Sequence, residues 1–105
     1  MGEPADTIEI VRLDQGRAGE YHAHVPGTEQ VGRLTWTEHD GPDGTTVRVA
    51  DRTLVPPELE GRGIARRLVE ELIADARTFG FRIDPHCSYV AAQFRRNPDW
   101  AGLRA

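Results

Sequence analysis

The chain has 105 residues, enough for one domain with one hydrophobic core and too few for an additional substrate-binding lobe. Its formal net charge is −4, which disfavours a nucleic-acid partner because phosphate binding needs a basic face. No apolar run is long enough to span a bilayer, so we expect no membrane partner.

The cysteine content and the first residues bear on the compartment. The single cysteine, Cys87, has no partner for an internal disulfide, so the chain needs no oxidising environment. Residues 1–6 are polar and lack the basic-then-apolar pattern of a signal peptide. We therefore expect a cytoplasmic location, a flexible N-terminus over residues 1–6 and a single domain over residues 7–105.

The first half of the chain contains four stretches of β-type sequence. Tyr21, Ala23 and Val25 alternate with polar residues, a period-two pattern typical of a strand with one face on the core. Leu34 and Trp36 face one way in the same manner. The stretches predicted as strands are residues 7–14, 18–25, 30–38 and 45–55. The short turns between them predict an antiparallel meander.

The second half begins with Pro56 and Pro57, which end the fourth strand because neither can donate a ladder hydrogen bond. Apolar residues then recur at helical spacing over residues 63–79 and predict a helix that ends at Gly80. The remaining predicted elements are a strand at 81–83, a helix at 89–96 and a tail whose Trp100 and Leu103 pack on the core. We expect both tryptophans and all three phenylalanines in the core. The order β-β-β-β-α-β-α predicts a mixed α/β (α+β) fold in which a helical crossover makes the fourth and fifth strands parallel.

The loop between the fourth strand and the long helix carries the most informative residues. Gly61 and Gly63 have no Cβ atom, so the loop can turn tightly and its N–H groups can approach a ligand. The first N–H groups of the following helix lack intrahelical partners and lie at the positive end of its dipole. Arg62, Arg66 and Arg67 add positive charge there. This combination predicts a phosphate or pyrophosphate site, and a plain loop whose glycines only ease a turn is the alternative.

Two other nucleotide-binding motifs do not fit this loop. A mononucleotide P-loop needs a longer gap and a Gly-Lys-Ser/Thr ending, whereas a dinucleotide fingerprint needs a third glycine and an initial βαβ unit. Neither pattern is present in the sequence.

The hexapeptide Glu60-Gly61-Arg62-Gly63-Ile64-Ala65 resembles the acetyl-CoA signature of the GNAT superfamily of N-acetyltransferases, Gln/Arg-x-x-Gly-x-Gly/Ala. It lies where that family has it, between the fourth strand and the long helix. Residues 53–69 and 85–100 further resemble a short single-domain GNAT-like subfamily. The N-terminal half resembles the family only by its strand pattern. The resemblance implies a sheet whose parallel fourth and fifth strands splay apart around acetyl-CoA.

The resemblance also implies roles for individual residues. Backbone groups of Thr53, Leu54 and Val55 would bind the pantetheine arm. The residues that would hold the pyrophosphate are Glu60, Gly61, Arg62, Gly63, Ile64, Ala65 and Arg66. The wider family has Gln or Arg at the position of Glu60, so backbone N–H groups and arginines must do most of the phosphate binding here. The implied reaction moves an acetyl group to an unidentified amine, either a small molecule or a protein lysine.

Acetyl transfer also needs a proton for the departing CoA thiolate. Many family members use a tyrosine of the last helix, but residues 93–96 contain none and Tyr89 lies one to two turns earlier. Cys87 is the candidate catalytic residue, because it follows the fifth strand and precedes a helix, whose N-terminus lowers a thiol pKa. The resembling subfamily has a cysteine at this place. A buried, inert cysteine is the alternative, and the adjacent His86 is expected at the surface.

The sequence defines the binding site for the acceptor amine less well than the site for acetyl-CoA. Gly16 leads directly into the next strand, which leaves no room for the helices that wall the acceptor pocket in longer family members. Arg52 occupies a place where the subfamily has histidine. His22 and His24 share a strand face but lack further ligands at metal-binding spacing, so we expect no metal. The alternatives to a small N-acetyltransferase are a non-catalytic or regulatory CoA-binding module and an anion-binding domain unrelated to CoA.

Overall fold

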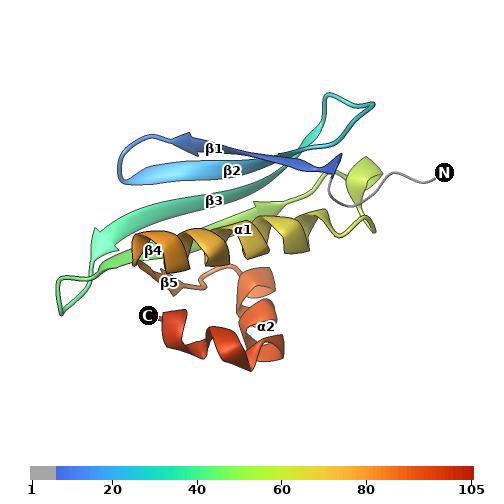
Figure 1. The fold of residues 1–105 in the computed structure, drawn as a ribbon. Helices are drawn as coiled ribbons and strands as arrows, with labels where there is room; N and C mark the ends of the chain where they lie inside the picture. The colour runs from blue at the N-terminus through green and yellow to red at the C-terminus, as the bar shows by residue number, and fades with distance from the viewer. Residues whose placement is uncertain (1–6) are drawn as a thin grey trace.

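A computed structural model describes residues 7–105, and the flexible N-terminus expected for residues 1–6 lies outside the described residues. The chain forms one five-stranded sheet in the order β1-β2-β3-β4-β5 (Figure 1). The strands are β1 (Glu9–Asp14), β2 (Ala18–His24), β3 (Val31–Asp40), β4 (Thr46–Leu54) and β5 (Arg82–Asp84). The first four pair antiparallel, and β5 pairs parallel with β4. The predicted element order and the parallel pair are confirmed.

Two helices follow the meander. α1 spans Ile64–Phe79 and α2 spans Ser88–Arg96. One 3-10 helix at Pro57–Leu59 and another at Pro98–Leu103 were not predicted. Strand and helix ends differ from the predicted ones by one or two residues, as frayed ends do.

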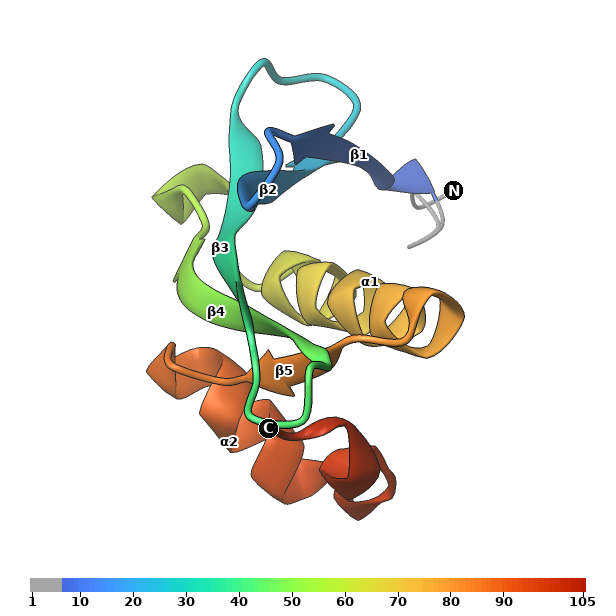
Figure 2. The same ribbon diagram turned by 90° about the vertical axis from the view of Figure 1, so that its left-hand side faces the viewer.

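One face of the sheet packs against α1, and the side chains on that face alternate along the strands. Tyr21, Leu34 and Trp36 are all buried on it. α1 packs across β2 and β3, and neither helix covers the opposite face of β1, β2 and β3 (Figure 2). A Cβ atom at Gly32 would lie 2.7 Å from Cγ2 of Ile64, so the glycine lets the start of α1 approach β3 closely.

A polar network joins α1 to the sheet inside this packed layer. Asp75 of α1, only 6% exposed, accepts hydrogen bonds from the Arg12 Nε and from the Tyr21 hydroxyl, both at 2.8 Å. The Tyr21 hydroxyl in turn accepts from Arg48 at 2.7 Å, and Arg48 pairs with Glu38 at 2.7 Å. Burial opposes ionisation of Asp75, but the hydrogen bonds from Arg12 and Tyr21 outweigh it and lower its pKa below the ordinary value.

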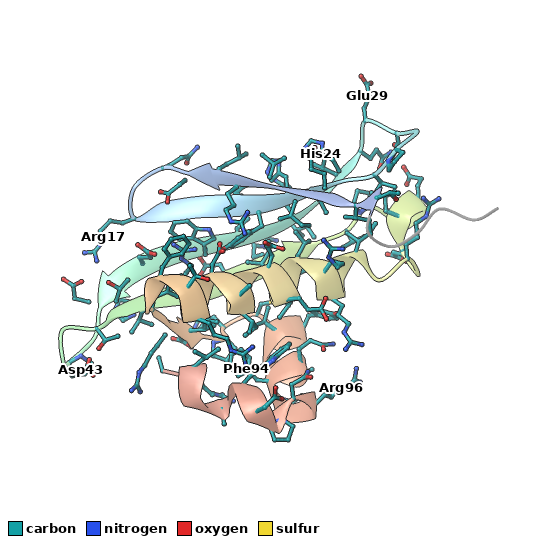
Figure 3. All side chains as sticks on the ribbon, viewed as in Figure 1. Arg17, His24, Glu29, Asp43, Phe94 and Arg96 are labelled. Carbon is teal, nitrogen blue, oxygen red and sulfur yellow. The ribbon has the colours of Figure 1, made fainter. Side chains whose placement is uncertain are left out.

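The C-terminal tail folds back on the core as predicted. The Trp100 and Phe94 rings meet edge to face with centroids 5.7 Å apart, and Phe94 points into the molecule (Figure 3). The Ala105 N–H donates to the Ile83 carbonyl at 2.8 Å. The prediction that all phenylalanines lie in the core is wrong for Phe79, which is 71% exposed at the last residue of α1.

Candidate functional site

The loop that joins β4 to α1 has the geometry of an anion site. Gly61 and Gly63 adopt φ values of 80° and 74°, in the left-handed region that favours glycine. Gly63 is the N-cap of α1, and the Arg67 N–H donates to its carbonyl at 3.1 Å. The N–H groups of the first helical residues before Arg67 therefore have no acceptor within the helix and lie at its positive end.

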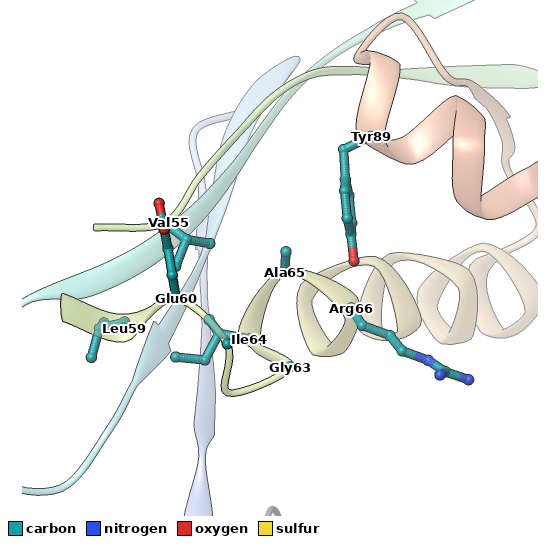
Figure 4. A pocket seen from close by; sticks show the side chains of 9 residues that line it. Val55, Leu59, Glu60, Gly63, Ile64, Ala65, Arg66 and Tyr89 are labelled. Atoms are coloured by element: carbon teal, nitrogen blue, oxygen red, sulfur yellow. The ribbon is translucent and has the colours of Figure 1, made fainter. Parts of the chain in front are cut away.

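A cavity of about 220 Å³ lies between this loop and α2 (Figure 4). Its lining comprises Val55, Leu59, Glu60, Gly61, Gly63, Ile64, Ala65, Arg66 and Tyr89. Seven of the ten residues expected at the cofactor line it, and Thr53, Leu54 and Arg62 do not. Leu54 lines a second hollow of about 280 Å³ together with Val31, Arg33, Val55 and Pro56.

Tyr89 is, with Leu59, one of the two lining residues that were not expected at the cofactor. Its side chain extends from α2 across the cavity, and its hydroxyl ends near Ala65 and Arg66 (Figure 4). The sequence offered one sign of this position: Tyr89 lies two residues after Cys87, the residue expected to act in catalysis at the start of α2.

The charged residues around the loop lie at the surface. Arg66 pairs with Glu70 at 3.2 Å across one helical turn, and both side chains are exposed, so the pair contributes little and leaves the guanidinium accessible. Arg62 is exposed as well. The carboxylate of Glu60 points away from Gly63 (Figure 4). Its negative charge is therefore not directed at the helix start.

The parallel strands separate next to this cavity. β5 pairs with β4 only from Val47 to Val49, and the last bond across the gap runs from the Cys87 N–H to the Ala50 carbonyl at 2.8 Å. Beyond Ala50, no described strand pairs with this edge of β4. The edge of β4 beyond Ala50 thus lies open to an extended ligand, as any free strand edge does, and the Thr53 backbone N–H faces the Cys87 sulfur there.

Cys87 lies at the separation point. Its Sγ is 3.4 Å from the Thr53 Oγ1, and the residue is partly exposed as the N-cap of α2. Burial raises the pKa of the thiol, but the Thr53 hydroxyl and the nearby backbone N–H groups of Val90 and Tyr89 outweigh it, so the pKa lies below its ordinary value. The sulfur makes no full capping hydrogen bond, so the N–H groups act at longer range.

His86 is exposed, as expected. The contact between the Cys87 sulfur and the Thr53 side chain was not predicted. Nothing in the sequence indicated this contact, because Thr53 and Cys87 lie 34 positions apart and meet only through the β4–β5 register.

The histidines of β2 show no metal cluster. His22 Nε2 lies 2.7 Å from the Glu20 carboxylate, and the His22 and His24 rings are 6.3 Å apart. Within residues 7–105, no group of three or more histidine, cysteine, aspartate or glutamate side chains is placed to hold a metal ion. In the same part of the chain, neither helix has the length and apolar character needed to cross a membrane.

Comparisons with known proteins agree with this architecture. Among solved structures, the ribosomal-protein-alanine N-acetyltransferase of Brucella melitensis biovar Abortus 2308 superposes with a TM-score of 0.57 and 23% sequence identity. The match covers 64% of this chain and 49% of that enzyme, so this chain spans about half of its length, and the likeness concerns the fold. A search of curated proteins found no significant match. The model of the family described as GCN5-related N-acetyltransferase matches residues 20–103, which is most of the chain. The chain belongs to the GCN5-related N-acetyltransferase family.

Proposed function

We propose that this chain binds acetyl-CoA and transfers its acetyl group to an amine. The observation that carries the proposal is the adjacency of two features: the left-handed glycine loop at the start of α1, and the free edge of β4 where β5 separates. The first suits a pyrophosphate, and the second suits an extended amide chain such as pantetheine.

The cofactor would lie along three groups of residues. The N–H groups at the start of α1, with Gly61 and Gly63 giving close access, would bind the pyrophosphate, and the Arg66 side chain would add a counter-charge. Backbone groups from Thr53 to Val55 would bind the pantetheine arm. The thioester would then reach the gap beside Cys87.

Cys87 would act as the proton donor. In the reaction the amine attacks the thioester carbonyl, and the tetrahedral intermediate collapses by breaking the C–S bond to CoA. The CoA sulfur leaves as a thiolate, and the Cys87 thiol, 3.4 Å from the Thr53 hydroxyl, would give it a proton. The proton that the attacking nitrogen loses would then return the Cys87 thiolate to the thiol. The lowered pKa of Cys87 makes its thiol a stronger acid than an ordinary thiol, which favours this transfer.

Release of CoA thiol from acetyl-CoA over a panel of amines and lysine peptides tests the proposal. The chain itself contains no lysine, so acetylation of its own lysine side chains cannot contribute to the signal. Amine-dependent release that saturates with acetyl-CoA is the expected result. If CoA binds but no amine accelerates release, the chain is a CoA-binding module without transfer activity, and the proposed reaction is wrong.

A further inference from the structure

The uncovered face of the sheet carries a row of polar side chains at the level of the β4–β5 gap. Glu20 of β2 pairs with Thr35 of β3, and Thr35 pairs with Arg52 of β4. Directly paired residues project to the same face, and Leu34, the neighbour of Thr35, is buried against α1. Glu20, Thr35 and Arg52 therefore all project away from α1.

A β-bulge in β4 adds a charge to this row. Trp36 pairs with Ala50, whereas the preceding Thr35 pairs with Arg52, so Asp51 is the extra residue. The Thr37 hydroxyl lies 3.3 Å from the Asp51 carboxylate, which places the Asp51 side chain on the uncovered face beside Arg52. Bulges of this kind redirect side chains next to functional sites.

The carboxylates of this face are already engaged, and the guanidinium of Arg52 is not. Glu20 pairs with His22 at 2.7 Å and with Arg33 at 3.5 Å, and Asp51 pairs with Thr37. Arg52 is exposed, and its side chain makes no hydrogen bond or ion pair with any residue of the described range 7–105. The planar guanidinium of Arg52 therefore has its hydrogen-bond donors free on this face.

Arg52 also lies next to the gap where the thioester would end. It precedes Thr53, whose hydroxyl contacts the Cys87 sulfur from the α1 side of β4. One strand backbone thus separates the free guanidinium from the proposed reacting atoms. A group bound by Arg52 would approach the thioester from the uncovered face.

We propose that the acceptor is an amine that also carries a carboxylate, as a free amino acid does, and that Arg52 binds this carboxylate. The inference rests on the proposed acetyl transfer and names the substrate class of the same site. Guanidinium binds carboxylate through two parallel hydrogen bonds, a geometry that a lone ammonium does not offer.

The test compares kcat/KM for matched acceptors with and without the carboxylate: phenylalanine against phenethylamine, and lysine against cadaverine. The wild-type chain should prefer the acceptor with the carboxylate. Arg52→Gln should reduce that preference by about tenfold or more, mainly through KM, and Arg52→Glu should shift it toward the diamine. Arg17→Gln is the matched control, since Arg17 lies at the β1–β2 turn and pairs only with Asp40 among the described residues (Figure 3). An unchanged preference in Arg52→Gln would overturn the inference.

A second measurement does not depend on turnover. Phenylglyoxal modifies exposed arginines, and mass spectrometry reports which ones. With CoA present, phenylalanine should protect Arg52 and phenethylamine should not. Protection of Arg52 without transfer to any amine would support the carboxylate site and contradict the proposed transferase activity. Equal modification with both compounds would contradict the carboxylate site whatever the activity.

Discussion

Gly63 combines a positive φ with open space around it, as Gly80 does at the other end of α1. Its φ of 74° strains any other residue, and a Cβ atom built there would meet no protein atom within 4 Å. The protein therefore leaves open the space in front of the helix start, and only a ligand would be displaced by an added side chain.

Gly63→Ala should consequently weaken acetyl-CoA binding while the fold survives with a loss of about 1–2 kcal/mol from the left-handed conformation. Gly80→Ala is the matched control, because Gly80 has a φ of 79° at the other end of α1 and also has open space around it. Both variants should lose similar stability in urea unfolding, and calorimetric titration should show weakened acetyl-CoA binding only for Gly63→Ala. Equal affinity in both would place the pyrophosphate elsewhere.

The pH dependence of kcat tests the role of Cys87. A proton donor must be protonated, so kcat should fall as pH rises through the Cys87 pKa, which lies below the ordinary thiol value because of Thr53 and the start of α2. Cys87→Ser should lower kcat by about a hundredfold. It should also remove this descending limb and leave the affinity for acetyl-CoA unchanged. If Cys87 were instead inert, the serine variant would keep the full rate and the same pH profile.

The reagent accessibility of Cys87 gives an independent control for that result. Iodoacetamide should alkylate the partly exposed thiol, and bound acetyl-CoA should slow the reaction by covering the sulfur. Equal alkylation rates with and without acetyl-CoA would separate Cys87 from the thioester.

Among individual residues, the sequence predicted the features that depend on neighbouring residues in the chain and missed those that depend on distant ones. The glycine loop and the position of Cys87 before a helix depend on neighbouring residues, and both are where they were expected. The Thr53–Cys87 contact and the direction of Tyr89 depend on how β4, β5 and α2 meet. No hydrophobic period or motif spacing in the sequence indicates how these three elements contact one another.

Among the elements, α1 and the strands were predictable because each has one buried face. The apolar stripe of α1 and the alternation of β2 and β3 follow directly from burial on one side. The bulge at Asp51 was not predictable, since an extra residue in one strand leaves the alternation of its neighbours nearly intact. Phe79 was assigned to the core by its type, yet it lies at the end of α1, outside the buried stripe.

The network of Asp75 should make the attachment of α1 to the sheet depend on pH. Because the folded-state pKa of Asp75 is lowered, its contribution to stability is present above the ordinary carboxyl pKa of about 4 and is lost as pH falls below that value. Asp75→Asn should cost about 1–3 kcal/mol at pH 7 by weakening the bonds to Arg12 and Tyr21.

Urea unfolding of both proteins between pH 7 and pH 3 measures this effect. The free-energy difference between wild type and Asp75→Asn should shrink as pH falls through the lower end of that range. A constant difference at every pH would show that the charge of Asp75 contributes nothing, and that its effect is one of packing alone.

For the molecule as a whole, we expect that a small family member still binds acetyl-CoA although neither described helix covers one face of β1, β2 and β3. A ligand that binds only the folded state stabilises it by about 2.7 kcal/mol at a hundredfold excess over Kd. In a domain of this size that corresponds to a rise in melting temperature of about 10 °C or more.

Melting temperature as a function of acetyl-CoA concentration measures this stabilisation, with wild type, Gly63→Ala and Gly80→Ala compared side by side. We expect a steady rise in melting temperature for wild type and for Gly80→Ala as acetyl-CoA increases, and a much smaller rise for Gly63→Ala. No rise for wild type at millimolar acetyl-CoA would contradict binding altogether, and the same rise in all three proteins would contradict binding at the start of α1.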